Sequence, residues 1–164
     1  MNTDEHREGG AGMSSMKYST FAQMIGAGTI VMFGLMYLNV YSIDHVYFSE
    51  TRAYMAILMG AAMAAVMMAF MWKMYPRKGL NAAIVAGSVI VFGLTLWLVR
   101  SQATVDDVSY MRAMIPHHSV AILTSERAGI SDPKVRALAD KIIAAQRKEI
   151  GEMKAYIQEL EARP

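Results

Sequence analysis

The stretch that decides the fold is AYMAILMGAAMAAVMMAFMW, residues 53–72, which holds no charged side chain. Two further uncharged stretches flank it: STFAQMIGAGTIVMFGLMYLNV at 19–40 and LNAAIVAGSVIVFGLTLWLV at 80–99. An α-helix needs about 20 apolar residues to cross the hydrocarbon core of a bilayer, and each stretch has about that length. Buried helices of a soluble protein are the alternative, but three such stretches so close together favour a membrane. The sequence therefore predicts a transmembrane region of three helices over residues 19–99.

The composition agrees with this prediction. Hydrophobic residues make up 54% of the chain and charged residues only 18%, against about 25% charged residues in a typical soluble domain. The chain has 16 Met and no Cys, which excludes disulfides, thiolate metal ligands and a cysteine nucleophile. The formal net charge of +2 is too small to indicate nucleic-acid binding.

Lysine and arginine residues near the helix ends predict the orientation. The link after the second helix carries Lys73, Arg77 and Lys78, whereas the link before it, residues 41–52, carries Arg52 alone among basic residues other than histidine. Because links rich in Lys and Arg stay in the cytoplasm, residues 1–18 are also expected to be cytoplasmic. This tail is polar and rich in glycine, so we expect it to be disordered.

The C-terminal segment, residues 100–164, is then expected to lie outside the cytoplasm. Thr104, followed three residues later by an acidic side chain, is typical of a helix N-cap, and this helix is predicted to end near Ala128. Ser131 or Asp132 is expected to cap a second helix, which runs to about residue 162 with apolar residues spaced by three and four. The short turn between them predicts an antiparallel helical hairpin.

The first hairpin helix contains two methionines and two adjacent histidines around a proline. At 100° per residue, Met111, Met114 and His118 share one face, and His117 lies beside it on the Met114 side. Pro116 costs about 3 kcal/mol inside a helix and predicts a kink next to the histidine pair. A packed core prefers Leu, Ile and Val, so this combination calls for a chemical explanation.

Folding the hairpin places residues 142–146 opposite the histidine pair and residues 149–153 opposite Met111 and Met114. Gln146 interrupts the apolar stripe of its helix, and Glu149 is close enough to orient an imidazole. Thioether and imidazole ligands favour Cu(I) and, by the same logic, Ag(I), whereas imidazole alone also suits Zn(II), Ni(II) or Cu(II). The alternative is that the methionines fill a core and the histidines are buried polar residues with satisfied hydrogen bonds. The predicted metal site comprises Met111, Met114, His117, His118, Gln146, Glu149 and Met153.

These residues resemble the bacterial family called domain of unknown function 305. Its hallmark is Met-Ile-Pro-His-His, here Met114 to His118, followed by a pattern of Ile-Ile, Gln, Glu-Ile and Met, here between Ile142 and Met153. The resemblance covers roughly residues 106–160. It implies a ferritin-like helical bundle, association with copper binding or metal resistance, and in some members preceding membrane helices. The family often has a Met where this chain has Thr124, so a site that used that Met would be weaker or differently built here.

We therefore expect an all-α chain with three transmembrane helices and an extracytoplasmic two-helix hairpin over residues 100–164. The hairpin is half of a ferritin-like bundle, which self-association would complete. The expected function is soft-metal binding, with Cu(I) favoured and Ag(I) second, in metal homeostasis or resistance at the bacterial inner membrane. The alternative is a structural module that forms a membrane-bound helical oligomer without metal.

Methionines also recur at every fourth residue in the second predicted membrane helix. This pattern is analogous to Cu(I) paths in copper transporters, but packing beside Gly60 and Ala64, a pair of small residues spaced by four, is the favoured explanation. The series consists of Met55, Met59, Met63, Met67 and Met71.

Two further expectations concern the outer link and catalysis. His45 in that link either joins the site or is an interfacial residue, and the second is favoured. The chain has no phosphate-binding loop, nucleophile elbow or zinc-protease motif, so we expect no enzyme. A metal-dependent or haem-dependent enzyme is the weaker alternative.

Overall fold

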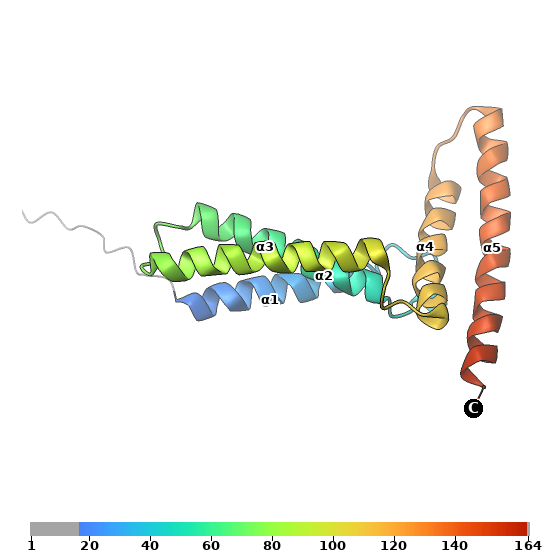
Figure 1. Cartoon of the computed structure of the whole chain (residues 1–164). Helices are drawn as coiled ribbons and strands as arrows, with labels where there is room; N and C mark the ends of the chain where they lie inside the picture. Colours follow the sequence, from blue (N-terminus) through green and yellow to red (C-terminus); the bar gives the residue numbers. More distant parts are fainter. Residues whose placement is uncertain (1–16, 164) are drawn as a thin grey trace, which may run out of the picture.

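The computed structural model describes residues 17–163 of the chain, and within that range it contains five α-helices and one short 3-10 helix. Helices α1, α2 and α3 run side by side as a bundle, and α4 and α5 lie next to each other across one end of it (Figure 1). No strand occurs in this range, so the all-helical prediction is confirmed for it. The elements are α1 at Tyr18–Leu35, η1 at Ile43–His45, α2 at Glu50–Phe70, α3 at Lys78–Ser101, α4 at Asp107–Arg127 and α5 at Pro133–Glu161.

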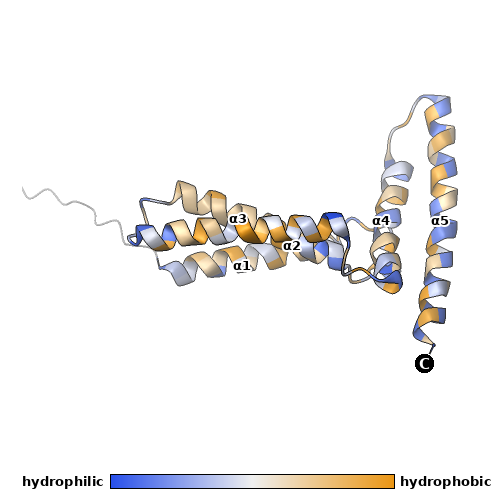
Figure 2. Ribbon diagram, viewed as in Figure 1, coloured by the Kyte–Doolittle hydropathy of each residue, from blue (hydrophilic) through white to orange (hydrophobic). Residues whose placement is uncertain are grey.

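Helices α1, α2 and α3 are each long and apolar enough to cross a membrane. Their ribbons are predominantly apolar along their length, whereas polar residues gather at the bundle ends and on α5 (Figure 2). Helix α1 begins one residue before the predicted span, with Lys17 at its N-cap. Residues 1–16 of the predicted cytoplasmic tail lie outside the described residues.

Helix α1 ends at Leu35, five residues before the end of the apolar stretch that was predicted to be helical. The guanidinium of Arg52 donates a hydrogen bond to the carbonyl of Met36 at 2.8 Å, and the backbone N–H of Ser49 donates to the Tyr37 hydroxyl at 3.1 Å. Both donors come from the start of α2. The start of the next helix therefore satisfies polar groups at the end of α1, and the remaining apolar residues form a turn.

The link between α2 and α3 closes the bundle end that lies far from α4 (Figure 1). Asn81 is fully buried there, and its amide donates to the carbonyls of Trp72 and Tyr75 while its oxygen accepts from the Tyr18 hydroxyl at 2.8 Å. Tyr75 is also fully buried, and its ring packs against those of Tyr18 and Phe21. Aromatic residues at the end of an apolar helix often lie at a membrane interface, but Tyr75 lies inside the bundle.

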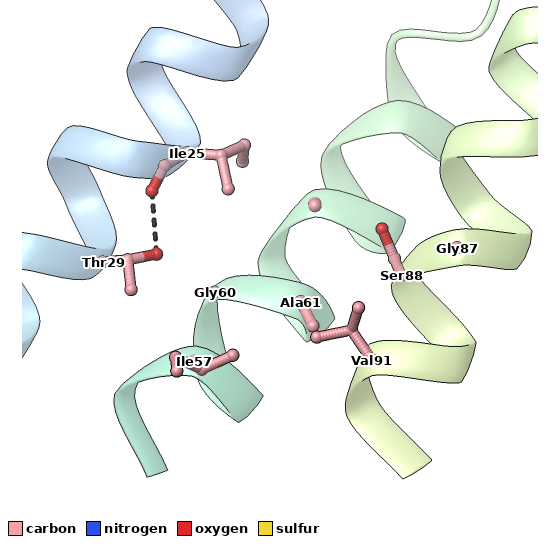
Figure 3. A pocket seen from close by; sticks show the side chains of 9 residues that line it. Ile25, Thr29, Ile57, Gly60, Ala61, Gly87, Ser88 and Val91 are labelled. Carbon is pink, nitrogen blue, oxygen red and sulfur yellow. Dashed lines mark hydrogen bonds between the residues drawn. The ribbon is translucent and has the colours of Figure 1, made fainter. Parts of the chain in front are cut away.

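The methionines of α2 mostly pack between helices. The terminal methyl of Met63 lies where a side chain at Gly28 of α1 would stand, and Met67 and Met71 pack against the buried cluster around Met68. Gly60, which is buried, faces Thr29 of α1, whose hydroxyl donates to the carbonyl of Ile25 at 2.8 Å (Figure 3). This geometry supports the packing explanation of the methionine series for its inner members.

Replacing Gly60 with Ala is expected to loosen the contact between α1 and α2. A methyl group at this position would overlap Thr29 Oγ1 and stand 3.3 Å from its Cβ, so the Thr29 side chain or one of the two helices must move. Such overpacking costs roughly 1–3 kcal/mol, which exceeds the roughly 0.5–1 kcal/mol that Ala gains over Gly in a helix interior. Thermal unfolding of the purified protein in detergent, followed by circular dichroism, measures the change.

Gly26→Ala and Gly93→Ala are matched controls, because no heavy atom lies within 4 Å of the added methyl in either. Both should leave the melting temperature unchanged or raise it. Thr29→Ala introduced together with Gly60→Ala should restore much of the lost stability, since it removes the hydroxyl that the new methyl meets. A Gly60→Ala protein as stable as these controls would contradict the close approach of the two helices.

The C-terminal helices begin at aspartate caps. Asp106, not Thr104, is the N-cap of α4, and its carboxylate accepts a hydrogen bond from the backbone N–H of Ser109 at 2.7 Å. Asp132 caps α5, as one of the two predicted alternatives, and Pro133 occupies its first turn. Helix α4 runs through Pro116 as one helix, and the proline ring is fully buried.

Candidate functional site

Helix α4 turns its most apolar face toward α5. Met111, Ile115 and Ile122 are buried there in one cluster with three isoleucines of α5, and Met153 of α5 packs against the same cluster. Because these α4 residues follow one another at spacings of four and seven, they lie within about 40° of each other around the helix. The cluster holds the two helices together and surrounds the predicted site with apolar side chains.

His118 lies on the edge of this face and points across to α5. Its Nδ1 atom is 3.0 Å from the carbonyl oxygen of Met114, and its Nε2 atom is 2.7 Å from a carboxylate oxygen of Glu149. The His118 side chain is 13% exposed and that of Glu149 is 51% exposed. Because a carbonyl oxygen can only accept, Nδ1 of His118 is the donor in the first of these hydrogen bonds. The predicted proximity of Glu149 to an imidazole is therefore present in the structure.

Gln146 lies one turn before Glu149 along α5, and its side chain is partly buried. The amide oxygen Oε1 is fully buried and has no hydrogen-bond partner among the described residues. A buried acceptor without a partner costs about 1–3 kcal/mol, so it needs a ligand or a water to compensate. In the sequence, Gln146 is notable because it interrupts an apolar stripe. In the structure, its side chain indeed points inward and its amide oxygen has no partner among the described residues.

His117 and Met114 belong to a different face of α4. Their positions are about 120° and 60° away from Met111 around the helix. Together with Tyr110 and Ala113 they line a pocket against the first turns of α2 and the end of α3. The rings of His117 and His118 are 6.3 Å apart between centroids and tilted by 69°. The seven residues that were expected in one cluster are thus divided between two places.

A third set of contacts joins α4 to the link that contains η1. Ser119 is fully buried, and its hydroxyl oxygen accepts a hydrogen bond from the backbone N–H of Tyr41 at 2.7 Å. The same oxygen lies 3.0 Å from Nδ1 of His45. Because Tyr41 donates to Ser119, the hydroxyl is free to donate its own proton to the imidazole. The sequence pattern did not reveal Ser119, since its partners lie more than seventy positions away along the chain.

Charged groups fix the same link over α5. Asp44 accepts a hydrogen bond from Nζ of Lys154 at 2.5 Å and another from the Ser42 hydroxyl, and these bonds lower the pKa of Asp44 to about 2. Burial lowers the pKa of His45, which favours the neutral imidazole that accepts from Ser119. His45 therefore docks the link onto α4, close to the histidine pair but bound to Ser119.

The residues that could hold a metal ion are few. Within residues 17–163, no three His, Asp or Glu side chains gather into a metal-binding group. Besides its two imidazoles, the predicted site offers thioether and amide donors. His118 with Glu149, and His117 with Met114, are the two places where such donors come together, and the metal role of the seven residues stays a prediction.

Comparisons with known proteins give two matches. Residues 107–164, the C-terminal third of the chain, match the sequence profile of the family described as Domain of unknown function (DUF305). An uncharacterized protein of Acanthamoeba polyphaga mimivirus is 33% identical over 88 residues, which are 52% of this chain and 58% of the viral protein. The chain thus spans little more than half the length of that relative. No solved structure matches the chain significantly.

Proposed function

We propose, from the premise that residues 107–164 belong to the DUF305 family, that the chain is a membrane-anchored binding protein for a soft metal ion, Cu(I) or Ag(I). The observation that carries the proposal is the setting of His118. Its Nδ1 atom is held by the Met114 carbonyl, and its Nε2 atom points at the carboxylate of Glu149. This arrangement is typical of a metal-binding imidazole, whose second nitrogen is usually fixed by a backbone carbonyl.

A bound ion would take the place of the hydrogen bond that Nε2 of His118 makes with Glu149. Glu149, half-exposed on α5, would then either share the ion or balance its charge. Gln146 supplies a buried amide oxygen that has no partner among the described residues. Met111 and Met153 bring two thioethers into the neighbouring apolar cluster. An imidazole, two thioethers and few charges suit a monovalent soft ion better than a divalent hard one.

The proposed location is the bacterial inner membrane, with α4 and α5 on its outer side. The link between α2 and α3 lies at the bundle end opposite to α4 (Figure 1), and it carries Lys73, Arg77 and, at the start of α3, Lys78. The positive-inside rule assigns that end to the cytoplasm. A reporter enzyme that works only outside the cytoplasm should therefore be active when it is fused to the C-terminus. We propose a role in binding and metal tolerance, with no catalytic step.

Titration of the purified full chain in detergent with Ag(I), and with Cu(I) under anaerobic conditions, tests this function. Saturable uptake against a competing chelator is expected for both ions, and tight uptake of Mg(II) or Ca(II) is not, because these ions need several oxygen ligands. Uptake no greater than that of detergent alone would contradict the proposal.

Assembly is a second candidate function, and the outer surface of α5 favours it. Val135, Leu138 and Ile142 follow one another at spacings of three and four and are 50%, 58% and 38% exposed. Such a stripe can be buried by a second copy of the same helix pair, which would complete a four-helix bundle. Sedimentation of the full chain with and without Ag(I) separates the two functions: assembly without metal uptake would support the purely structural role.

A further inference from the structure

A pocket of about 270 Å³ lies where α4 rests on the end of the helical bundle. It is formed by the first turns of α2, the residue that follows α3, and one face of α4, the elements that meet at that bundle end in Figure 1. We call it the junction pocket. It is separate from the His118–Glu149 contact, which lies between α4 and α5.

Three soft donors line the junction pocket. Met114 and His117 come from α4, where a spacing of three residues places them on one face. Met55 comes from α2 and is 42% exposed, although it stands in the methionine series whose inner members pack inside the bundle. His117 forms no hydrogen bond with another described residue, in contrast to His118, so both of its ring nitrogens are available.

The charge of the pocket selects the kind of ion. No carboxylate lines it, so nothing there would neutralise a divalent cation. Arg52 contributes the one positive charge among the lining residues, but its guanidinium binds the Met36 carbonyl and lies 4.6 Å from the centre of the Tyr37 ring. Two thioethers and one imidazole without a counter-charge are a donor set for a monovalent soft ion.

We infer that the junction pocket is a second soft-metal site, in which Met55, Met114 and His117 bind Cu(I) or Ag(I). The inference rests on the proposed function, because it assumes that the chain takes up such ions. It assigns the two adjacent histidines to two different ions and makes Met55 of the membrane bundle a ligand. The site therefore spans the bundle and the α4–α5 pair, and neither part contains it alone.

The experiment measures the number of Ag(I) ions bound by the purified full chain in detergent. Two ions per chain are expected for the wild type and one for Met55→Leu, which conserves the volume of the side chain and removes the sulfur. Met59→Leu is the matched control, because Met59 stands one turn further along the same series and does not line the pocket. It should retain both ions. His118→Ala should also retain one ion, at the junction pocket.

A second readout identifies the ligands directly. With ¹³C-labelled methionine methyl groups, Ag(I) should shift the NMR signals of Met55 and Met114 in the His118→Ala variant, where only the junction pocket remains. Two bound ions in Met55→Leu, or unshifted signals of both methionines, would overturn the inference. If Met55→Leu binds one Ag(I) ion fewer than the wild type and His118→Ala binds as many as the wild type, the result would support the junction pocket and contradict the proposed site at His118.

Discussion

Replacing His118 with Ala is expected to weaken Ag(I) binding at the α4–α5 site by about 100-fold or more, because it removes the imidazole that would hold the ion. Loss of a residue that merely orients a metal ligand typically costs 10–100-fold, and loss of the ligand itself should cost at least the upper end of that range. The affinity should be measured in the Met55→Leu background, so that the junction pocket does not contribute. An unchanged affinity in that background would show that His118 is only a buried polar residue bound to Glu149.

Two glutamates of α5 provide a matched pair for the same measurement. Glu149 contacts Nε2 of His118, whereas Glu152 pairs with Lys148 on the solvent side at 3.4 Å. Glu149→Gln is expected to weaken Ag(I) binding about tenfold through the altered partner of the imidazole. Glu152→Gln should leave it unchanged. Equal effects of the two substitutions would indicate a general loss of negative charge and no specific role of Glu149.

Replacing Ile115 with Ala is expected to destabilise the α4–α5 pair by roughly 2–5 kcal/mol, the range measured for large apolar side chains truncated in well-packed cores. Ile115 is 0% exposed and lies in the centre of the cluster between the two helices. Proteolysis of the full chain in detergent over a urea series measures the stability of these helices. Cleavage within α4 and α5 should begin at lower urea than in the wild type, while the α1–α3 bundle stays protected.

Ile142→Ala removes the same atoms from a position on α5 that is 38% exposed. It should shift the urea dependence by less than half as much, because the side chain leaves a smaller cavity and loses less buried area. If the two isoleucines have equal effects, then either the core lies elsewhere or Ile142 is covered in an assembly. Sedimentation of the Ile142→Ala protein separates these two explanations.

Local sequence signals predicted most of the elements. The uncharged stretches located α2 and α3 closely, and the sequence around Asp132 and Pro133 located the start of α5. The end of α1 was not predictable, because a donor from the next helix, Arg52, satisfies the Met36 carbonyl. The start of α4 was placed two residues early, because Thr104 and Asp106 are both residues that cap helices well.

Only part of the candidate site could be predicted, because several of its contacts come from segments that are distant in the sequence. The spacing of residues along α4 and the length of the hairpin turn predicted that Glu149 lies close to an imidazole, and in the structure this imidazole is that of His118. The sequence did not show that α4 has three neighbours, namely α5, the α1–α3 bundle and the link around η1. A difference of about 60° around the helix is enough to direct Met114 toward the bundle while Met111 stays in the core. Ser119 was not predicted, because no local sequence pattern distinguishes a serine that is buried by distant segments from an exposed one.

X-ray absorption at the copper K edge, on the full chain loaded with Cu(I), tests the central claim most directly. It reports the atoms bound to the ion without relying on a substitution. The account predicts sulfur scatterers together with at least one imidazole nitrogen in the first shell, and loss of the imidazole signal when His117 and His118 are both replaced by Ala. A first shell of oxygen or nitrogen alone, or a spectrum that the double substitution leaves unaltered, would contradict the proposal that these methionines and histidines bind a soft metal.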